Sequence, residues 1–344
     1  MFEFIKNTNS LLQLSIIIIN YKSCQLVIDC IQSIYEQNSA CAYEIIVVDN
    51  NSEDSSKEKI TGLFPGVVWI EMKYNSGFAR ANNEGIRHSK GEVVLLLNPD
   101  TIVKDDAISK CYNNFAQSDY AACGLQILNP DNTPQVSGLY AVKGGLNFLL
   151  QLPYAGSLLK FIGNGLKFSK PNVPVAIGVV EVDWINGAFL MVKRAAVERA
   201  GLLDEDFFLY AEEAEWCSRL KKTGKLCIYG GIHIIHLQAG TSLPTFQSED
   251  KAYKNIFDKK GLQIMVSTFV RIRKEFGVGW FLFILLIFIL DIPVFLIGVS
   301  ITFLFMLKDG YTFNDFFGYV KNIAKTILLT HHIILNKPYF YKML

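Results

Sequence analysis

Short apolar runs alternate with helical patterns over the first hundred residues of the chain. Four runs have no polar face and consist mainly of β-branched and aliphatic residues, which is typical of strands covered on both sides in a parallel sheet. These runs cover residues 15–19, 45–48, 67–70 and 93–97. Apolar residues recur at helical spacing in residues 24–36 and 77–88. The alternation predicts an α/β fold with a doubly wound, mostly parallel sheet.

The middle of the chain is less regular. Residues 130–174 contain several glycines and prolines and an apolar stretch at 146–152. Strand patterns follow at residues 180–192 and 232–237, on either side of a helix predicted at about 211–222.

Polar residues follow three of the predicted parallel strands. They are Asn20-Tyr21, Asp49-Asn50 and Asn98-Pro99-Asp100. Carboxyl ends of parallel strands meet at one sheet edge, where open α/β folds bind ligands. Pro99 ends the ladder of strand hydrogen bonds, and the carboxylate of Asp100 suits a divalent cation on a diphosphate. The alternative is ordinary turn chemistry, in which Asn98 and Asp49 only form Asx turns.

Two further segments carry candidate chemistry. The loop Asn75–Ala79 opens a helix, so its backbone N–H groups are candidates for a phosphate contact, while Asn75 is equally well explained as a helix cap. Glu212, Glu213 and Glu215 begin another helix. The helix dipole stabilises carboxylates at this position, and a carboxylate can also serve as a general base. Glu212 and Glu215 share a helix face, and Glu213 points elsewhere.

Two histidines compete as a metal ligand near the end of a predicted strand. His236 ends the apolar run and precedes Gly240 and Ser242, while His233 lies three residues earlier. A histidine at a strand end near an acidic cation site is a credible ligand, so His236 is preferred.

Composition narrows the class of protein. The 344 residues are 51% hydrophobic, which is high for a soluble protein and indicates a membrane-associated part. The formal net charge of +1 gives no support to nucleic-acid binding. Seven scattered cysteines without a CxxC motif favour reduced thiols in a cytosolic compartment. The first ten residues lack the layout of a signal peptide.

The carboxyl-terminal part contains the most apolar segment. Residues 280–307 carry one charge, Asp291, and one proline, Pro293, and these two are expected to break the segment into halves too short to span a bilayer. Basic residues flank both ends, so a re-entrant or interfacial hairpin is preferred over a single spanning helix, and a buried soluble helix pair is a third alternative. Residues 313–335 predict an amphipathic helix. Its expected apolar face is Phe316, Val320, Ile323, Ile327 and Leu328, and its expected polar face is Lys321, Asn322 and Lys325.

Taken in order, these segments resemble the family 2 glycosyltransferases with a GT-A fold, especially the bacterial rhamnosyltransferase-like group. The matching segments are Ser15–Tyr21, Val47–Ser52, Asn75–Ala79 with Asn83 and Gly85, Leu97–Asp100, Trp184 with Gly187-Ala188, Phe207–Tyr210 with Glu212-Glu213, and His236 with Gly240 and Ser242. The resemblance covers roughly residues 14–245. It implies a GT-A domain at 11–262, with a nucleotide-sugar part at 11–125 and an acceptor and catalytic part at 126–262, followed by a membrane-associated helical region at 263–344.

The resemblance also implies roles for individual residues. Asp49 would recognise the pyrimidine nucleoside, and Asp100 with His236 would hold Mg²⁺ or Mn²⁺ on the donor diphosphate. Glu213 stands where the family most often has an aspartate as catalytic base, and Glu212 remains the alternative. The other implied donor-binding residues are Asn20, Tyr21, Asn75, Gly77, Phe78, Asn83 and Asn98. The implied acceptor-side residues are Trp184, Gly187 and Tyr210.

The function implied is an inverting, metal-dependent glycosyltransferase. The QxxRW signature of processive members is missing, so one sugar is expected per acceptor. The donor would be a dTDP- or UDP-sugar, with rhamnose or a hexose transferred to a lipid-linked oligosaccharide of a bacterial surface polysaccharide. The catalytic domain would lie on the cytoplasmic face of the inner membrane. A sugar nucleotidyltransferase and a degenerate glycosyltransferase kept as a membrane assembly partner are the alternatives; Asn20–Ser23 is not the basic, glycine-rich loop of the former.

Overall fold

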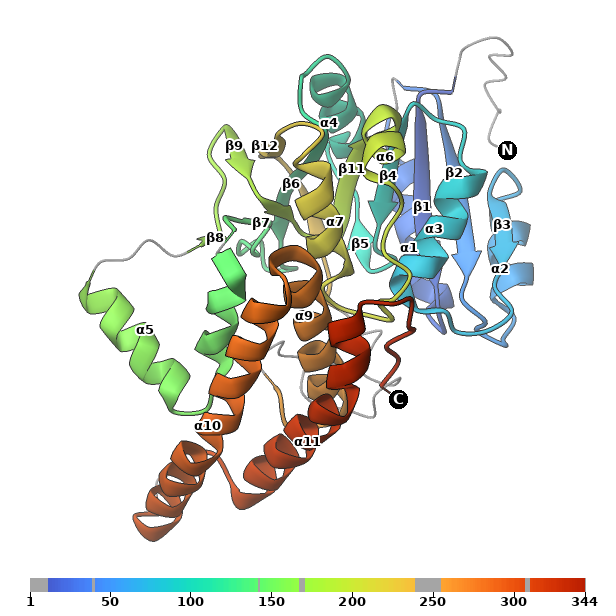
Figure 1. Ribbon diagram of the computed structural model, residues 1–344. Helices are drawn as coiled ribbons and strands as arrows, with labels where there is room; N and C mark the ends of the chain where they lie inside the picture. The colour runs from blue at the N-terminus through green and yellow to red at the C-terminus, as the bar shows by residue number, and fades with distance from the viewer. Residues whose placement is uncertain are drawn as a thin grey trace. The chain divides into compact units, whose positions relative to one another are not determined.

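The computed structural model describes residues 12–38, 41–141, 143–166, 171–238, 255–306 and 310–343 (Figure 1). The chain divides into two compact units. The first contains Met1–Leu139, Asn172–Leu203 and Trp216–Ala239, and the second contains Tyr140–Pro171, Asp204–Glu215 and Gly240–Leu344. This division differs from the predicted boundary after residue 262, because two earlier segments group with the carboxyl-terminal helices.

A mixed sheet forms the centre of the first unit. Its first four strands in sequence are β1 (Leu14–Asn20), β2 (Tyr43–Asp49), β3 (Val68–Glu71) and β4 (Val93–Leu97). They lie in the order β3-β2-β1-β4 and run parallel, which confirms the four predicted strands and their direction. The expected cover on both sides is wrong for β3, which is an edge strand with exposed residues at both ends. The order continues β11-β6-β12-β5, with β11 antiparallel to both of its neighbours.

The remaining strands are shorter or come later in the chain. They are β5 (Thr101–Ile102), β6 (Ala122–Leu128), β9 (Val179–Val182), β11 (Phe189–Lys193) and β12 (Leu226–His236), with β7 (Gly138–Leu139), β8 (Asn172–Val173) and β10 (Trp184–Ile185) in a small second sheet. The single strand region predicted at 180–192 is therefore three strands in two sheets. The strand predicted at 232–237 is the last half of β12, which shifts register between Tyr229 and His233.

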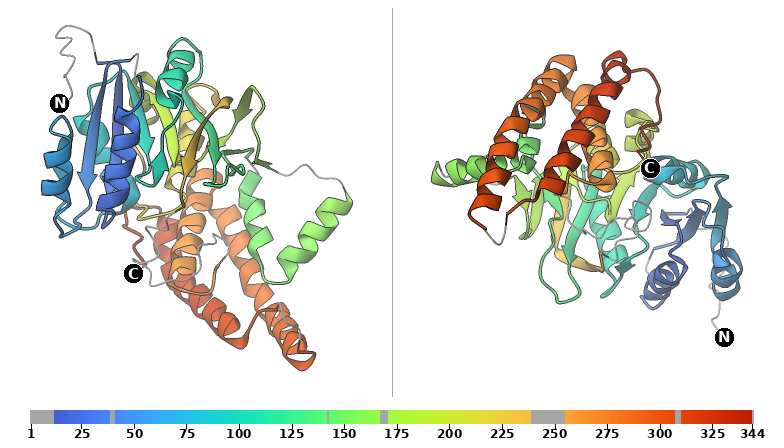
Figure 2. Two further views of the ribbon diagram at one scale, coloured as in Figure 1. Left: turned by 180° about the vertical axis from the view of Figure 1, so that it is seen from behind. Right: turned by 90° about the horizontal axis from the view of Figure 1, so that it is seen from below.

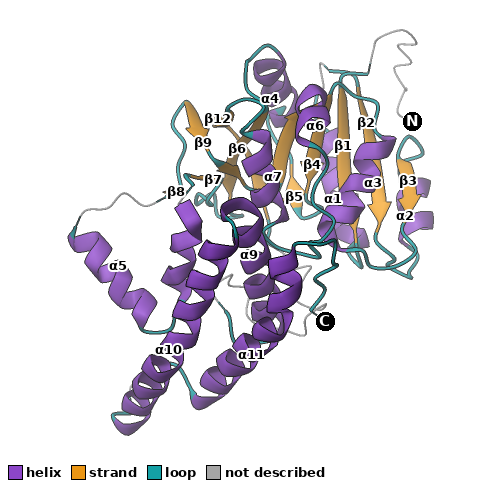
Figure 3. Cartoon of the chain, viewed as in Figure 1, coloured by secondary structure: helices purple, strands orange, loops and turns teal. Residues whose placement is uncertain are grey.

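Helices cover both faces of the main sheet (Figure 3). Because side chains alternate along β1, Ile16 and Ile18 point to one face and Ile17 to the other. The first face packs against α1 (Cys24–Tyr35), α2 (Ser56–Leu63) and α4 (Ala107–Ala116). The second face packs against α3 (Gly77–His88), α6 (Arg194–Ala200) and side chains of α7 (Glu212–Leu220). This arrangement places the carboxyl ends of β1, β2 and β4 at one edge.

The second unit is helical. It contains the 3₁₀ segment η1 (Lys143–Gln151), α5 (Ala155–Gly165), α9 (Lys259–Phe276), α10 (Val278–Leu304) and α11 (Phe313–Leu335). Figure 2 shows α9, α10 and α11 side by side. Aromatic rings form much of their shared core, with Phe148 of η1 stacked on Phe288 at 4.8 Å between ring centroids.

The predicted break in the apolar carboxyl-terminal segment is wrong. Residues Val278–Leu304 form one helix that continues through Asp291 and Pro293, and by length and composition it is the one described helix that could cross a membrane. A proline removes one hydrogen bond of a helix, and packing on both sides of it compensates for that loss. Phe288 and Phe295 supply this packing, since both rings contact Tyr319 of α11.

The predicted faces of α11 also need correction. Its bounds agree with the sequence, and a capping box between Thr312 and Asp315 explains its start. However, Asn322 is buried, because its amide donates to the carbonyl oxygens of Ile256 and Asp258 at 3.0 and 2.9 Å. Leu328, by contrast, is exposed. A periodicity argument does not foresee a polar side chain that satisfies backbone groups inside a core.

Candidate functional site

The polar residues that follow β1, β2 and β4 lie at one edge of the sheet. β1 pairs in register with β2, which sets Asn20 opposite Asp49, and the amide of Asn20 donates to Asp49 Oδ1 at 2.7 Å. β1 also pairs in parallel with β4, whose last residue, Leu97, leads directly into Asn98. One edge of the sheet therefore gathers Asn20, Asp49 and Asn98.

Asp49 is a structural part of this edge. Its carboxylate accepts from Asn20 and from the backbone N–H of Ser52 at 3.0 Å, and its side chain is almost fully buried. The turn expected as the alternative explanation is thus present. Asn20 is buried as well, whereas Tyr21 is partly exposed, with the ammonium of Lys22 5.7 Å from its ring centroid.

Asp100 and His236, the two predicted metal ligands, lie next to each other in the first unit. His236 Nε2 lies 3.2 Å from Asp100 Oδ1, and both side chains are nearly buried. Strand register brings them together, because β12 pairs with β5 so that His236 lies opposite Thr101. The competing His233 lies elsewhere, 3.8 Å from the exposed carboxylate of Asp105.

Gln135 sets the orientation of the His236 ring. Its amide nitrogen donates to the carbonyl of His236 at 2.8 Å, and its oxygen lies 3.0 Å from Nδ1. In the neutral ring Nδ1 therefore carries the proton and the lone pair of Nε2 faces Asp100, whereas in the doubly protonated ring the Nε2–H donates to Asp100. Sequence reasoning missed Gln135, since its 101-residue separation from His236 leaves no local motif.

The pair fits a divalent cation. A neutral imidazole lone pair facing a carboxylate oxygen is repulsive unless a proton or a metal ion lies between them. Neighbouring ligands of an octahedral ion with bonds of about 2.1 Å lie about 3 Å apart, close to the separation of Asp100 and His236. Among the described residues no cluster of three His, Cys, Asp or Glu side chains could hold a metal, so the remaining ligands would come from the diphosphate and water.

Asparagine side chains engage N–H groups at the start of α3. The N–H of Ser76 donates to Asn50 Oδ1 at 2.8 Å, and the N–H of Gly77 donates to Asn75 Oδ1 at 3.1 Å. These two N–H groups are therefore engaged, Gly77 in an Asx turn formed by Asn75, while the N-cap residue is Ser76, whose side chain makes no capping hydrogen bond. Phe78 packs on the apolar core beside α3.

Asn83 has a different task from the donor contact predicted for it. Its side chain is fully buried, and its amide exchanges two hydrogen bonds with the backbone of Leu203, at 2.9 and 3.0 Å. An amide used in this way fixes the chain path and is not exposed to a ligand.

Glu212 and Glu213 belong to the second unit and differ in environment. Glu212 is buried, and among the described residues its Oε2 has no hydrogen-bond partner. Burial, and next the charge of Glu213, raise the pKa of Glu212 well above its usual range. Glu213 is partly exposed. The backbone enters this helix through two left-handed residues, Tyr210 and Ala211, with φ of 70° and 69°.

The predicted acceptor-side residues lie on separate elements. Trp184 is in β10 and is partly buried against the apolar core. Gly187 lies in the turn between β10 and β11, where the side chain of Asn186 accepts from the N–H of Ala188 at 3.0 Å. Tyr210 belongs to the second unit.

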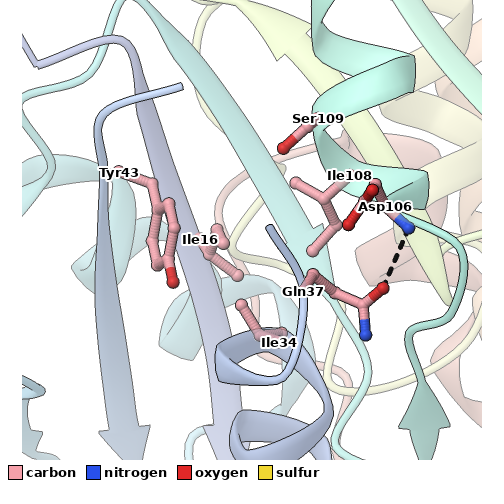
Figure 4. Close-up of a pocket in the computed structure, with 7 residues that line it drawn as sticks. All are labelled: Ile16, Ile34, Gln37, Tyr43, Asp106, Ile108 and Ser109. Atoms are coloured by element: carbon pink, nitrogen blue, oxygen red, sulfur yellow. Dashed lines mark hydrogen bonds between the residues drawn. The ribbon is translucent and has the colours of Figure 1, made fainter. Parts of the chain in front are cut away.

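A small cavity in the first unit lies away from these residues (Figure 4). It has a volume of about 10 Å³ and is lined by Ile16, Tyr43 and Ile108, among others, where Gln37 accepts from the N–H of Asp106. A cavity of this size holds one water at most, so it is a packing gap.

The segment that forms this edge of the sheet matches a known protein family. The family model described as glycosyl transferase family 2 matches residues 15–163. Residues 15–163 belong to glycosyl transferase family 2. This glycosyl transferase family 2 domain contains the strands β1, β2 and β4 and the residues Asp49 and Asp100.

Curated relatives are similar over a little more than half of the chain. The low-salt glycan biosynthesis hexosyltransferase Agl10 of Haloferax volcanii is 30% identical over 61% of this chain and 62% of its own length. Rhamnosyltransferase WbbL of Escherichia coli is 26% identical over 56% of this chain and 72% of its own length. An N-acetylglucosaminyl-diphospho-decaprenol L-rhamnosyltransferase of Mycobacterium tuberculosis is 24% identical, over 54% and 63%.

A solved structure shows the fold around this family 2 domain. The mannosyltransferase PcManGT of Pyrobaculum calidifontis, in complex with GDP-Man and Mn²⁺, superposes with a TM-score of 0.51 at 14% identity, over 92% of this chain and 87% of its own. The mixed α/β architecture with its mostly parallel central sheet is therefore that of the GT-A glycosyltransferases, as predicted.

Proposed function

We propose that this protein is an inverting, metal-dependent, non-processive glycosyltransferase. The observation that carries the proposal is the contact between Asp100 and His236. A carboxylate oxygen and an imidazole nitrogen are suitable ligands for a divalent cation. The relatives named for hexosyl and rhamnosyl transfer support the reaction class.

Asp100 and His236 would hold Mg²⁺ or Mn²⁺. When bound, such a cation neutralises the charge that develops on the leaving diphosphate. Gln135 would keep Nε2 of His236 directed toward the ion, in the way that outer hydrogen bonds orient metal-binding histidines. The Mn²⁺ in the complex of PcManGT supports this assignment.

Asp49 and Tyr21 would bind the nucleoside of the donor. The Asp49 carboxylate, held in place by Asn20 and Ser52, would accept from the base or the ribose, and the partly exposed ring of Tyr21 would offer a stacking surface. Three asparagines would hold the donor site in place. Asn20 donates to Asp49, Asn50 accepts from the N–H of Ser76, and Asn83 donates to the carbonyl of Leu203.

Glu213 would be the catalytic base. It would take the proton from an acceptor hydroxyl while that oxygen attacks the anomeric carbon, and the bond from this carbon to the diphosphate oxygen would break with its electrons on the diphosphate. A single displacement from the opposite face inverts the configuration and needs no second carboxylate as nucleophile. The partial exposure of Glu213 supports it over the buried Glu212.

The donor would be a dTDP- or UDP-sugar that carries rhamnose or a hexose, and the acceptor would be a lipid-linked oligosaccharide. The rhamnosyltransferase relatives support the sugar, and the diphospho-decaprenol named for the mycobacterial relative supports a lipid-linked acceptor. A lipid-linked acceptor requires a membrane surface, and the long apolar helix α10 supports membrane association. Because nucleotide sugars are cytosolic, the catalytic part would lie on the cytoplasmic face of the inner membrane.

A donor screen tests the proposal. Purified protein with membranes is incubated with dTDP-rhamnose and with UDP- and GDP-hexoses in Mg²⁺ or Mn²⁺, and release of the nucleoside diphosphate is followed together with incorporation of label into lipid. One donor is expected to give release that depends on both the metal and the lipid fraction. Absence of release with every donor would contradict the proposal.

A further inference from the structure

The outward side of α10 is apolar along the helix except at Ser300, whose exposed hydroxyl donates to the carbonyl of Leu296. Exposed aliphatic side chains recur at spacings of three and four residues, which places them in one stripe on the helix surface. This outer stripe consists of Leu282, Leu286, Leu290, Val294, Ile297 and Ile301. Over 27 residues the helix is about 40 Å long, so the stripe is larger than the scattered exposed apolar residues of a soluble surface.

The opposite side of α10 is covered by protein. Phe281 packs against Phe269 of α9 at 5.8 Å between ring centroids, and Phe295 packs against Phe316 of α11 at 5.6 Å. Asp291, the one charged residue of the helix, is buried on this side. The charge of α10 is therefore turned away from the outer stripe.

Charged neighbours limit how deeply α10 can enter a membrane. The start of α9 is level with Phe295, because the ring of Phe257, next to the helix cap Asp258, lies 5.7 Å from it. The part of α10 from Val278 to Phe295 lies beside α9 and α11. These two helices expose Lys259, Lys321 and Lys325. A bilayer crossing would bring these ammonium groups into the hydrocarbon core.

The part of α10 beyond Phe295 is too short to cross alone. Residues 296–304 extend about 14 Å, which is less than half the thickness of a hydrocarbon core of about 30 Å. An orientation along the membrane surface satisfies both the outer stripe and the exposed lysines of α9 and α11.

α5 offers a second apolar surface in the same unit. Leu158, Phe161, Ile162 and Leu166 are exposed on it. It joins the body of the unit through Tyr154, whose hydroxyl lies 2.7 Å from Thr302 Oγ1 of α10 and whose ring occupies the space where a Cβ of Gly298 would be. Sequence periodicity alone did not single out this helix.

We infer that α10 lies in the plane of one membrane leaflet, with its outer stripe at the boundary between headgroups and acyl chains, and that α5 is a second lipid contact. The chain then does not cross the bilayer. This inference rests on the membrane part of the proposed function and specifies it. A monotopic attachment would give a lipid-linked acceptor access to the protein from one leaflet.

Vesicle binding tests the contact. The full chain is floated with vesicles of phosphatidylethanolamine and phosphatidylglycerol, and Leu290→Glu and Ile297→Glu are expected to lower the bound fraction about tenfold or more, with a smaller loss for Phe161→Glu. Leu63→Glu on α2 is the matched control, since Leu63 is 59% exposed and Leu290 60% exposed, and it should bind like the wild type. Wild-type binding by the folded α10 variants would overturn the inference. Binding does not depend on sugar transfer, so an inactive protein leaves this test intact.

Reporter fusions test the orientation in cells. An enzyme active only in the cytosol and one active only outside the inner membrane are fused in turn after Leu344 and before Met1 of the full chain. The inference expects both ends on the cytosolic side. Opposite sides for the two ends would mean that α10 crosses the membrane, which would overturn it even if the vesicle variants behave as expected.

Discussion

The Nε2 atom of His236 lies 3.2 Å from Oδ1 of Asp100, although 136 residues separate them in the sequence. Gln135 holds the other ring nitrogen of His236, so Nε2 is directed at the carboxylate. This relationship explains why these two side chains form a candidate cation site and why His233 does not contribute to it.

Metal affinity should depend on both members of this pair. Asp100→Asn and His236→Ala are each expected to weaken Mn²⁺ binding in the presence of UDP by about tenfold or more, because each removes one of two protein ligands. Titration calorimetry or the electron paramagnetic resonance signal of free Mn²⁺ measures this directly. His233→Ala is the matched control and should bind Mn²⁺ normally. Equal affinity in His236→Ala would assign the histidine a purely structural role.

Sugar transfer should depend on Glu213. Replacement by glutamine keeps the size and polarity of the side chain but removes its ability to take a proton, so kcat is expected to fall by about 10²-fold or more. Donor binding, measured by calorimetry with the nucleoside diphosphate, should not change. Glu212→Gln serves as the comparison and should retain a larger share of the activity. Unchanged turnover in Glu213→Gln would sink its assignment as the base.

The stability of the protein should depend on pH through Glu212. Burial, and next the charge of Glu213, raise its pKa above the ordinary value of 4.5, so the folded state holds this proton more tightly than the unfolded state. The favourable contribution is complete below pH 4.5. It is lost as the pH rises from 4.5 through the raised pKa, at about 1.4 kcal/mol per pH unit.

Glu212→Gln should therefore remove this slope and raise the free energy of unfolding at neutral pH. Urea denaturation across the pH range measures the difference between the variant and the wild type, and the exposed Glu58→Gln is the control. An identical pH profile for Glu212→Gln and wild type would show that the buried carboxyl group does not carry this cost.

Lys274 should stabilise the second unit by pairing two carboxylates. Its ammonium lies 2.6 Å from Asp204 Oδ2 and 2.7 Å from Asp206 Oδ2, and Asp206 also accepts from the backbone N–H of Tyr339. Burial alone would lower the pKa of Lys274, but the hydrogen bonds and charges of the two aspartates raise it instead. The side chain is thus charged at neutral pH and is well matched to its neighbours.

Lys274→Met should destabilise the protein by about 2 kcal/mol, because it leaves two largely buried carboxylates without their cation. The double variant with Asp206→Asn should recover part of that loss, since one uncompensated charge is removed. Thermal and urea unfolding measure both. Strictly additive losses in the double variant would mean that the two side chains are not coupled.

Local patterns were sufficient to predict the framework of the sheet. The apolar runs of β1, β2 and β4 exclude a solvent-facing side, so burial, parallel pairing and the shared edge at Asn20, Asp49 and Asn98 follow from the residues themselves. The helices at 77–88 and 313–335 have the predicted bounds. Hydrophobic burial and helix capping act over a few residues, and a sequence states them directly.

Contacts between distant segments were decided only by the tertiary structure. The contact of His236 with Asp100 depends on the pairing of β12 with β5, and the orientation of its ring depends on Gln135, 101 residues away. The buried position of Asn322 and the continuity of α10 through Pro293 depend in the same way on groups from other helices. Each of these features arises because a polar or conformationally costly residue is compensated by a partner far along the chain, and local periodicity contains no information about that partner.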